Sequence, residues 1–179
     1  KRASLQRRLR HESLEDRRLM ALDIVADITT TPKSSDPAEF VQTGSSFYYV
    51  ATGPQGREVH YKIDSPQNPG FIERTGSFDL YYGENGSYPK ELTIFGDYVY
   101  FSADTLGGLV TGGGREVWRA KEDVVTPLMD IVPGINSSDP EDFTVVGNTL
   151  YFTAKSPGNG RELWKTDGTT AGTKMVHDI

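Results

Sequence analysis

The sequence predicts an all-β fold built from three copies of a four-stranded antiparallel unit. Two observations carry this prediction. Short motifs recur in the same order along most of the chain, and stretches rich in β-branched and aromatic residues alternate with turn residues. In addition, 19 Gly and 10 Pro among 179 residues are too many for a helical bundle.

An Asp followed by Ile or Leu opens each unit, at Asp27, Asp79, Asp130 and Asp178, so the spacings are 52, 51 and 48 residues. A Pro, a turn Gly, an aromatic strand and a Gly-Arg-Glu tripeptide then follow in constant order. These markers are Pro37, Pro89 and Pro140; Gly44, Gly96 and Gly147; residues 47–51, 99–103 and 150–154; and 56–58, 114–116 and 160–162. The chain therefore divides into repeats at 27–78, 79–129 and 130–177, with a fourth starting at 178.

The third repeat shows the strands most clearly, at 142–146, 149–154, 161–166 and 173–179. Each stretch is enriched in residues that favour strands. The turns between them contain Gly-Asn, Gly-Asn-Gly and Asp-Gly, which readily adopt the backbone conformations of tight turns. Successive short turns make all four strands antiparallel neighbours.

Each repeat is expected to form four antiparallel strands. Apolar residues occur on both faces of the strand at 150–152, which predicts a sheet packed between two neighbouring sheets. We therefore expect a β-propeller-like array over residues 23–179; a β-sandwich is the main rival, but it would not need so regular a repeat. Three blades do not close a ring. An incomplete ring with open edges is expected, with further repeats of the same chain beyond Ile179, and residues 22–28 are a candidate outer strand for the last blade.

Charge is distributed unevenly between an N-terminal tail and the repeats. Residues 1–20 contain seven basic and three acidic residues, whereas the remaining residues contain 12 basic and 22 acidic ones. Residues 1–22 are therefore interpreted as a basic tail that is partly helical or disordered. Nucleic-acid binding, membrane binding and targeting are the alternative functions of such a tail. The acidic repeats argue against a nucleic-acid partner, and no apolar stretch predicts a transmembrane segment.

Two segments resemble known bacterial sequences. The run Glu162-Leu163-Trp164-Lys165-Thr166-Asp167-Gly168-Thr169 is similar to the ELWxxDGT repeat of bacterial surface and exported proteins. The second repeat keeps the Trp but lacks the Asp-Gly-Thr that follows it. The first repeat has His60 at the position of the Trp. Residues 8–21 resemble an LEPR-xLL-type N-terminal motif, which is read as a sorting signal. These resemblances imply a propeller-like protein of the cell surface or extracellular space.

Residues that recur in every repeat are expected to serve the fold. The paired Arg and Glu side chains are predicted to form ion pairs or hydrogen bonds between adjacent sheets, since a buried charge needs a partner. The Trp residues are expected to pack rather than stack on a ligand. These structural positions are Arg57, Glu58, Arg115, Glu116, Trp118, Arg161, Glu162, Trp164, Asp167 and Gly168.

Function is expected in the loops that vary between repeats, although turn chemistry explains the same residues without any ligand. Tyr beside Ser and Asn is typical of surfaces that bind carbohydrate or protein. The candidate ligand-binding residues are Tyr81, Tyr82, Tyr88, Ser137, Asp139 and Asn159. The glycine-rich loop 106–114 lacks a following Gly-Lys-Ser/Thr, so it is no phosphate loop, and flexible surface is the simpler interpretation.

No catalytic motif is found. The three His residues do not form a zinc motif, and no Gly-x-Ser-x-Gly or Asp-x-Asp-x-Asp-Gly loop occurs. We therefore expect no catalytic residues, no metal and no cofactor, and a non-enzymatic module for binding or scaffolding. The alternatives are part of a polysaccharide-acting propeller enzyme whose catalytic residues lie outside this chain, and a purely structural spacer.

Overall fold

The computed structural model describes residues 34–65, 72–106 and 113–178, in which all regular secondary structure is β-strand. The predictions for the tail at 1–22, the candidate strand at 22–28 and most of the loop 106–114 lie outside the described residues. The strands are β1 Ala38–Thr43, β2 Ser46–Gly53, β3 Gly56–Asp64, β4 Ile72–Phe78, β5 Lys90–Phe95, β6 Tyr98–Thr105, β7 Gly114–Lys121, β8 Val124–Met129, β9 Glu141–Val146, β10 Thr149–Ser156, β11 Gly160–Thr166 and β12 Lys174–His177.

The strands form three separate four-stranded antiparallel sheets in simple sequence order. We call β1–β4 sheet 1, β5–β8 sheet 2 and β9–β12 sheet 3. The predicted all-β class and the three antiparallel four-stranded units are thus confirmed, and the described strands close no barrel. In sheet 3 the last strand is shorter than the predicted 173–179, because the backbone N–H of Thr173 bonds within the preceding turn, to the carbonyl oxygen of Thr170 at 3.2 Å.

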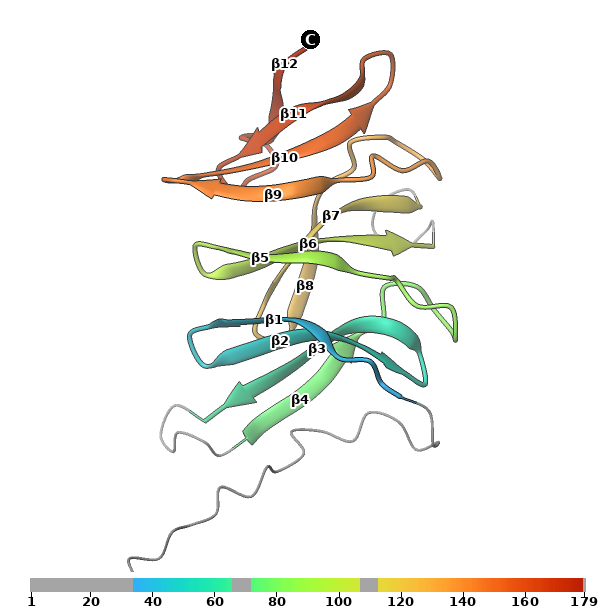
Figure 1. Cartoon of the computed structure of the whole chain (residues 1–179), viewed down its shortest axis with the longest axis vertical. Helices are drawn as coiled ribbons and strands as arrows, with labels where there is room; N and C mark the ends of the chain where they lie inside the picture. The colour runs from blue at the N-terminus through green and yellow to red at the C-terminus, as the bar shows by residue number, and fades with distance from the viewer. Residues whose placement is uncertain (1–33, 66–71, 107–112, 179) are drawn as a thin grey trace, which may run out of the picture.

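The three sheets are stacked, with sheet 2 between the other two (Figure 1). The first strands of the sheets form a column, in which β1 contacts β5 and β5 contacts β9. The hairpins β1–β2, β5–β6 and β9–β10 all lie on one side of the stack, at the left in Figure 1. We call this side the hairpin rim, and the opposite side, where the connections between sheets run, the connection rim.

Two apolar layers hold the stack together. Between sheets 1 and 2, Tyr48, Val50 and Val59 pack against a face that includes Phe101 and Trp118. Between sheets 2 and 3 the second layer contains Tyr100, Val117, Leu128, Leu150, Phe152 and Trp164. Because successive residues of a strand point to opposite faces, neighbouring residues of β6 serve different layers. This explains the unbroken apolar character of the central strands.

The Trp position of the repeat lies at the same place in each sheet. Phe101 is directly opposite Trp118 in sheet 2, and Phe152 is opposite Trp164 in sheet 3. In sheet 1 the equivalent pair is Tyr49 and His60, whose rings stack with centroids 5.4 Å apart. His60 therefore takes the position of the Trp as part of a cross-strand aromatic pair.

The first strand of each sheet is interrupted by a bulge at an acidic residue. The register shifts in β1, β5 and β9, and Glu39, Glu91 and Asp142 have φ of 54°, 61° and 62°. Such a backbone conformation is uncommon for residues other than Gly. A bulge also leaves a backbone N–H outside the ladder of its own sheet, and in β5 and β9 that group bonds to the preceding sheet.

Candidate functional site

The connection rim contains the residues singled out for ligand binding. Tyr82 and Tyr88 are exposed by 58% and 52%, whereas Tyr81 is half-buried. Asn159 lies at the tip of the β10–β11 hairpin and bonds to Ser156 of the same hairpin through its backbone N–H at 3.3 Å and its side chain at 3.4 Å. The exposed tyrosines are available to a ligand, and Asn159 supports its own turn.

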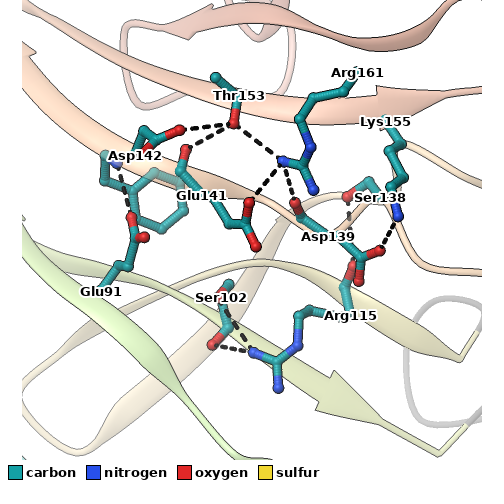
Figure 2. Close-up of polar contacts among 11 residues, drawn as sticks. Glu91, Ser102, Arg115, Ser138, Asp139, Glu141, Asp142, Thr153, Lys155 and Arg161 are labelled. Carbon is teal, nitrogen blue, oxygen red and sulfur yellow. Dashed lines mark hydrogen bonds and ion pairs between the residues drawn. The ribbon is translucent and has the colours of Figure 1, made fainter.

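Ser137 and Asp139, which lie just before β9, are half-buried and held by polar contacts. Ser137 Oγ accepts a 2.9 Å hydrogen bond from the backbone N–H of Arg115. The carboxylate of Asp139 pairs with Lys155 at 2.6 Å, as Figure 2 shows. Both candidate residues therefore already have partners within the chain.

The Arg of each Gly-Arg-Glu motif contacts the segment that leads into the first strand of its own sheet. Arg57 donates to the carbonyl oxygen of Asp36 at 3.0 Å, Arg115 to that of Tyr88 at 2.8 Å, and Arg161 to that of Asp139 at 2.9 Å. Two guanidinium groups also form ion pairs within their own sheets. Arg115 pairs with Asp104 at 2.8 Å, and Arg161 pairs with Glu141 at 3.2 Å (Figure 2). These contacts of the three Arg side chains thus lie within a sheet and its leading segment.

The neighbouring Glu contacts the connection to the following sheet instead. Both the backbone N–H and the hydroxyl of Ser87 donate to Glu58, the first at 2.7 Å. Glu116 accepts from the N–H and hydroxyl of Ser138 at 2.9 and 2.6 Å, and from the N–H of Ile131 at 3.1 Å. Burial raises the pKa of each of these carboxyl groups to about 7, against the lowering effect of the serine hydrogen bonds. Glu162, at the same position in sheet 3, is also buried.

A second set of junction residues was not found from the sequence. Glu39 accepts a 3.0 Å hydrogen bond from the bulge N–H of Leu92 in the next sheet, and Glu91 accepts one at 2.9 Å from Phe143. Asp142 is shorter and instead lies 3.2 Å from the hydroxyl of Thr153 in its own sheet. An acidic residue two positions after the marker Pro is the signal that would have identified them.

The two Trp residues are packing groups in the described structure. Trp118 and Trp164 are 4% and 7% exposed and belong to the two apolar layers. Neither indole nitrogen has a hydrogen-bond partner among the described residues. No ligand-facing surface is left on either ring.

The hairpin rim carries a groove between sheets 2 and 3, which we call the hairpin groove. Its volume is about 520 Å³. Three turns surround it: the β5–β6 hairpin with Asp97, the β9–β10 hairpin with Asn148, and the β11–β12 turn with Asp167, Gly168 and Thr169. Sequence reasoning considered only the loops of the other rim, so it missed this site.

Among the described residues, no three His, Asp or Glu side chains are grouped to hold a metal ion. Within the same ranges no helix is long and apolar enough to cross a membrane.

Comparisons with known proteins concern mainly the N-terminal segment. Residues 6–24 match the family model described as Planctomycete extracellular. Neither a curated protein nor a solved structure matches the chain. The match, although it covers a short region outside the described residues, supports an exported protein that is similar at its N-terminus to extracellular proteins of planctomycetes.

Proposed function

We propose that the chain is a non-enzymatic, exported module of propeller-like repeats that binds or scaffolds other molecules at the cell surface or outside the cell. The observation that carries the proposal is the set of hydrogen bonds made by the recurring Arg and Glu side chains. Glu58 and Glu116, which could be mistaken for catalytic groups, accept hydrogen bonds from Ser87 and Ser138 in the connections between sheets. The three Arg side chains donate to backbone carbonyl groups of the segment before their own sheet. These contacts support a structural role for both residue types.

Two further observations support a propeller-like arrangement. The first strands β1, β5 and β9 contact one another in a column, as the innermost strands of propeller blades do. The polar junction between sheets 1 and 2 is also repeated between sheets 2 and 3. Trp164, Asp167 and Gly168 occupy strand and turn positions consistent with an ELWxxDGT-type repeat.

The N-terminal segment supports the proposed location. Its basic residues precede the acidic repeats, and residues 6–24 match an extracellular family model. We interpret the LEPR-xLL-like run at 8–21 within it as a sorting signal. A reporter protein fused behind residues 1–22 is expected to be exported in a planctomycete host, and retention of the reporter inside the cell would contradict this part of the proposal.

The function itself is tested by incubating the full chain with a panel of polysaccharides and surface proteins. Binding without product release is the expected result. Release of sugar products would contradict the non-enzymatic proposal and favour a propeller enzyme. Failure to bind any member, with intact folding checked by circular dichroism, would favour a spacer role.

A further inference from the structure

We propose that the hairpin groove binds a neutral oligosaccharide; this inference rests on the proposed function, because it names the ligand class and the site of a binding module. The groove is distinct from the connection rim on which the sequence places its candidate residues. Its volume of about 520 Å³ falls in the usual range for small-molecule sites.

The length of the β11–β12 turn creates the groove. In sheet 2 the equivalent turn, between β7 and β8, is only Glu122-Asp123, and the carbonyl oxygen of Glu122 accepts a 3.0 Å hydrogen bond from the hydroxyl of Tyr48 in sheet 1. The depression between sheets 1 and 2 is accordingly smaller, at about 260 Å³. The longer turn of sheet 3 forms an extra wall over the junction with sheet 2.

This wall is held rigidly before any ligand arrives. Within the turn, Asp167 Oδ1 accepts hydrogen bonds from the N–H and hydroxyl of Thr169 at 2.9 and 2.7 Å. Two contacts fix the turn to sheet 2: Thr170 donates to the carbonyl oxygen of Leu128 at 2.8 Å, and Arg119 donates to that of Gly168. A preorganised site loses little conformational entropy on binding.

Gly168 also brings the turn into close contact with sheet 2. Its φ is 97°, and a Cβ at this position would lie 2.9 Å from the hydroxyl oxygen of Tyr100. Only a residue without a side chain fits between the turn and the sheet. The β11–β12 turn, which forms one wall of the groove, therefore packs directly against sheet 2.

The lining matches the hydroxyl groups and C–H faces of a sugar. Exposed carboxylates at Asp97 and Asp167 accept hydrogen bonds, and the amide of Asn148 both donates and accepts. The hydrogen bonds from Thr169 lower the pKa of Asp167, so its carboxylate is ionised at neutral pH. Exposed apolar side chains, Ile94 and Val145, provide surface for sugar C–H groups.

Tyr98 completes the lining as a fixed aromatic group. The guanidinium of Arg119 lies 4.8 Å from the centre of its ring, and the Lys121 ammonium lies 5.7 Å from it. Lys121 in turn pairs with Asp97 at 3.0 Å. The two carboxylates would repel a nucleic acid or another polyphosphate. Polar groups beside exposed apolar side chains in the lining fit a neutral saccharide best.

The test is a calorimetric titration of the full chain with cello-, xylo-, manno- and laminarihexaose. At least one hexasaccharide is expected to bind. Asn148→Ala and Asp167→Asn are each expected to weaken its binding about fivefold, the effect of losing one hydrogen bond. Asp167→Asn keeps an oxygen that accepts from Thr169, so the turn is preserved. Thermal unfolding of both variants checks that the fold is intact.

Matched controls come from the opposite rim. Ile135→Ala and Asn136→Ala, at exposed side chains of the β8–β9 connection, are expected to leave the affinity unchanged, whereas Tyr98→Leu is expected to reduce it. Loss of binding in the control variants alone would overturn the hairpin groove and keep the proposed function, because the ligand would then bind the connection rim. Binding of a surface protein or peptide without binding of any hexasaccharide would overturn the ligand class, and absence of all binding would overturn both proposals.

Discussion

Glu91 on β5 accepts a 2.9 Å hydrogen bond from the backbone N–H of Phe143 on β9, so a carboxylate of one sheet satisfies the bulge of the next. Replacing Glu91 by Ala leaves that N–H without its partner. The expected loss is about 1–3 kcal/mol of the free energy of unfolding, measured by urea denaturation. Asp142→Ala is the matched control, because Asp142 also has a positive φ but its carboxylate contacts Thr153 within its own sheet. Equal losses in both variants would contradict a junction role.

The buried carboxyl of Glu116 makes stability depend on pH. Its pKa is raised from 4.5 to about 7 in the folded chain, chiefly by burial. The folded state therefore holds a proton that the unfolded state releases, and the stabilisation, which is complete below about pH 4.5, is lost as the pH rises through about 7. Between pH 5 and pH 8, the free energy of unfolding of the wild type is expected to fall by roughly 2–3 kcal/mol more than that of Glu116→Gln, as measured by urea denaturation. An identical pH dependence in the two proteins would contradict the prediction.

Gly114 and Gly160 begin the Gly-Arg-Glu motif of sheets 2 and 3 with similar φ, 91° and 78°. A Cβ on Gly114 would collide with the carbonyl oxygen of Asn136 in the connection to sheet 3, whereas Gly160 has no atom that close among the described residues. Gly114→Ala is expected to destabilise the chain more than Gly160→Ala. Both variants introduce backbone strain, but only Gly114→Ala adds a collision of the Cβ with Asn136. The comparison is made by thermal unfolding, and equal shifts of the melting temperature would show that strain alone matters.

His60 is buried and stacked on Tyr49, and burial lowers its pKa from 6.5. A base with a lowered pKa contributes stability above its unfolded value, and this contribution is lost as the pH falls through its folded value. His60→Phe keeps the ring stacking and removes the titration. Its stability relative to wild type is expected to increase between pH 7 and pH 5, as measured by urea unfolding, and a constant difference would contradict this.

The repeat made much of the fold predictable. Pro, Gly and aromatic markers recur because each sheet needs the same turns and the same two apolar faces, so the strands of sheet 3 were located within a few residues. Glu39 and Glu91 escaped notice because an acidic residue two positions after the marker Pro does not by itself indicate a positive φ or a hydrogen bond to the next sheet. The hairpin groove escaped notice because three turns from two repeats form it, and its size depends on the length of the β11–β12 turn rather than on any motif.

The bulge contacts also bear on how such a chain can change in length. The bulges of β5 and β9 each offer an N–H to the sheet before, and Glu39 and Glu91 each offer a carboxylate to the sheet after. A unit inserted between two existing ones would meet the same donor on one side and the same acceptor on the other. Gene duplication of whole units therefore requires no new interface chemistry, and unfolding can proceed from the ends one unit at a time.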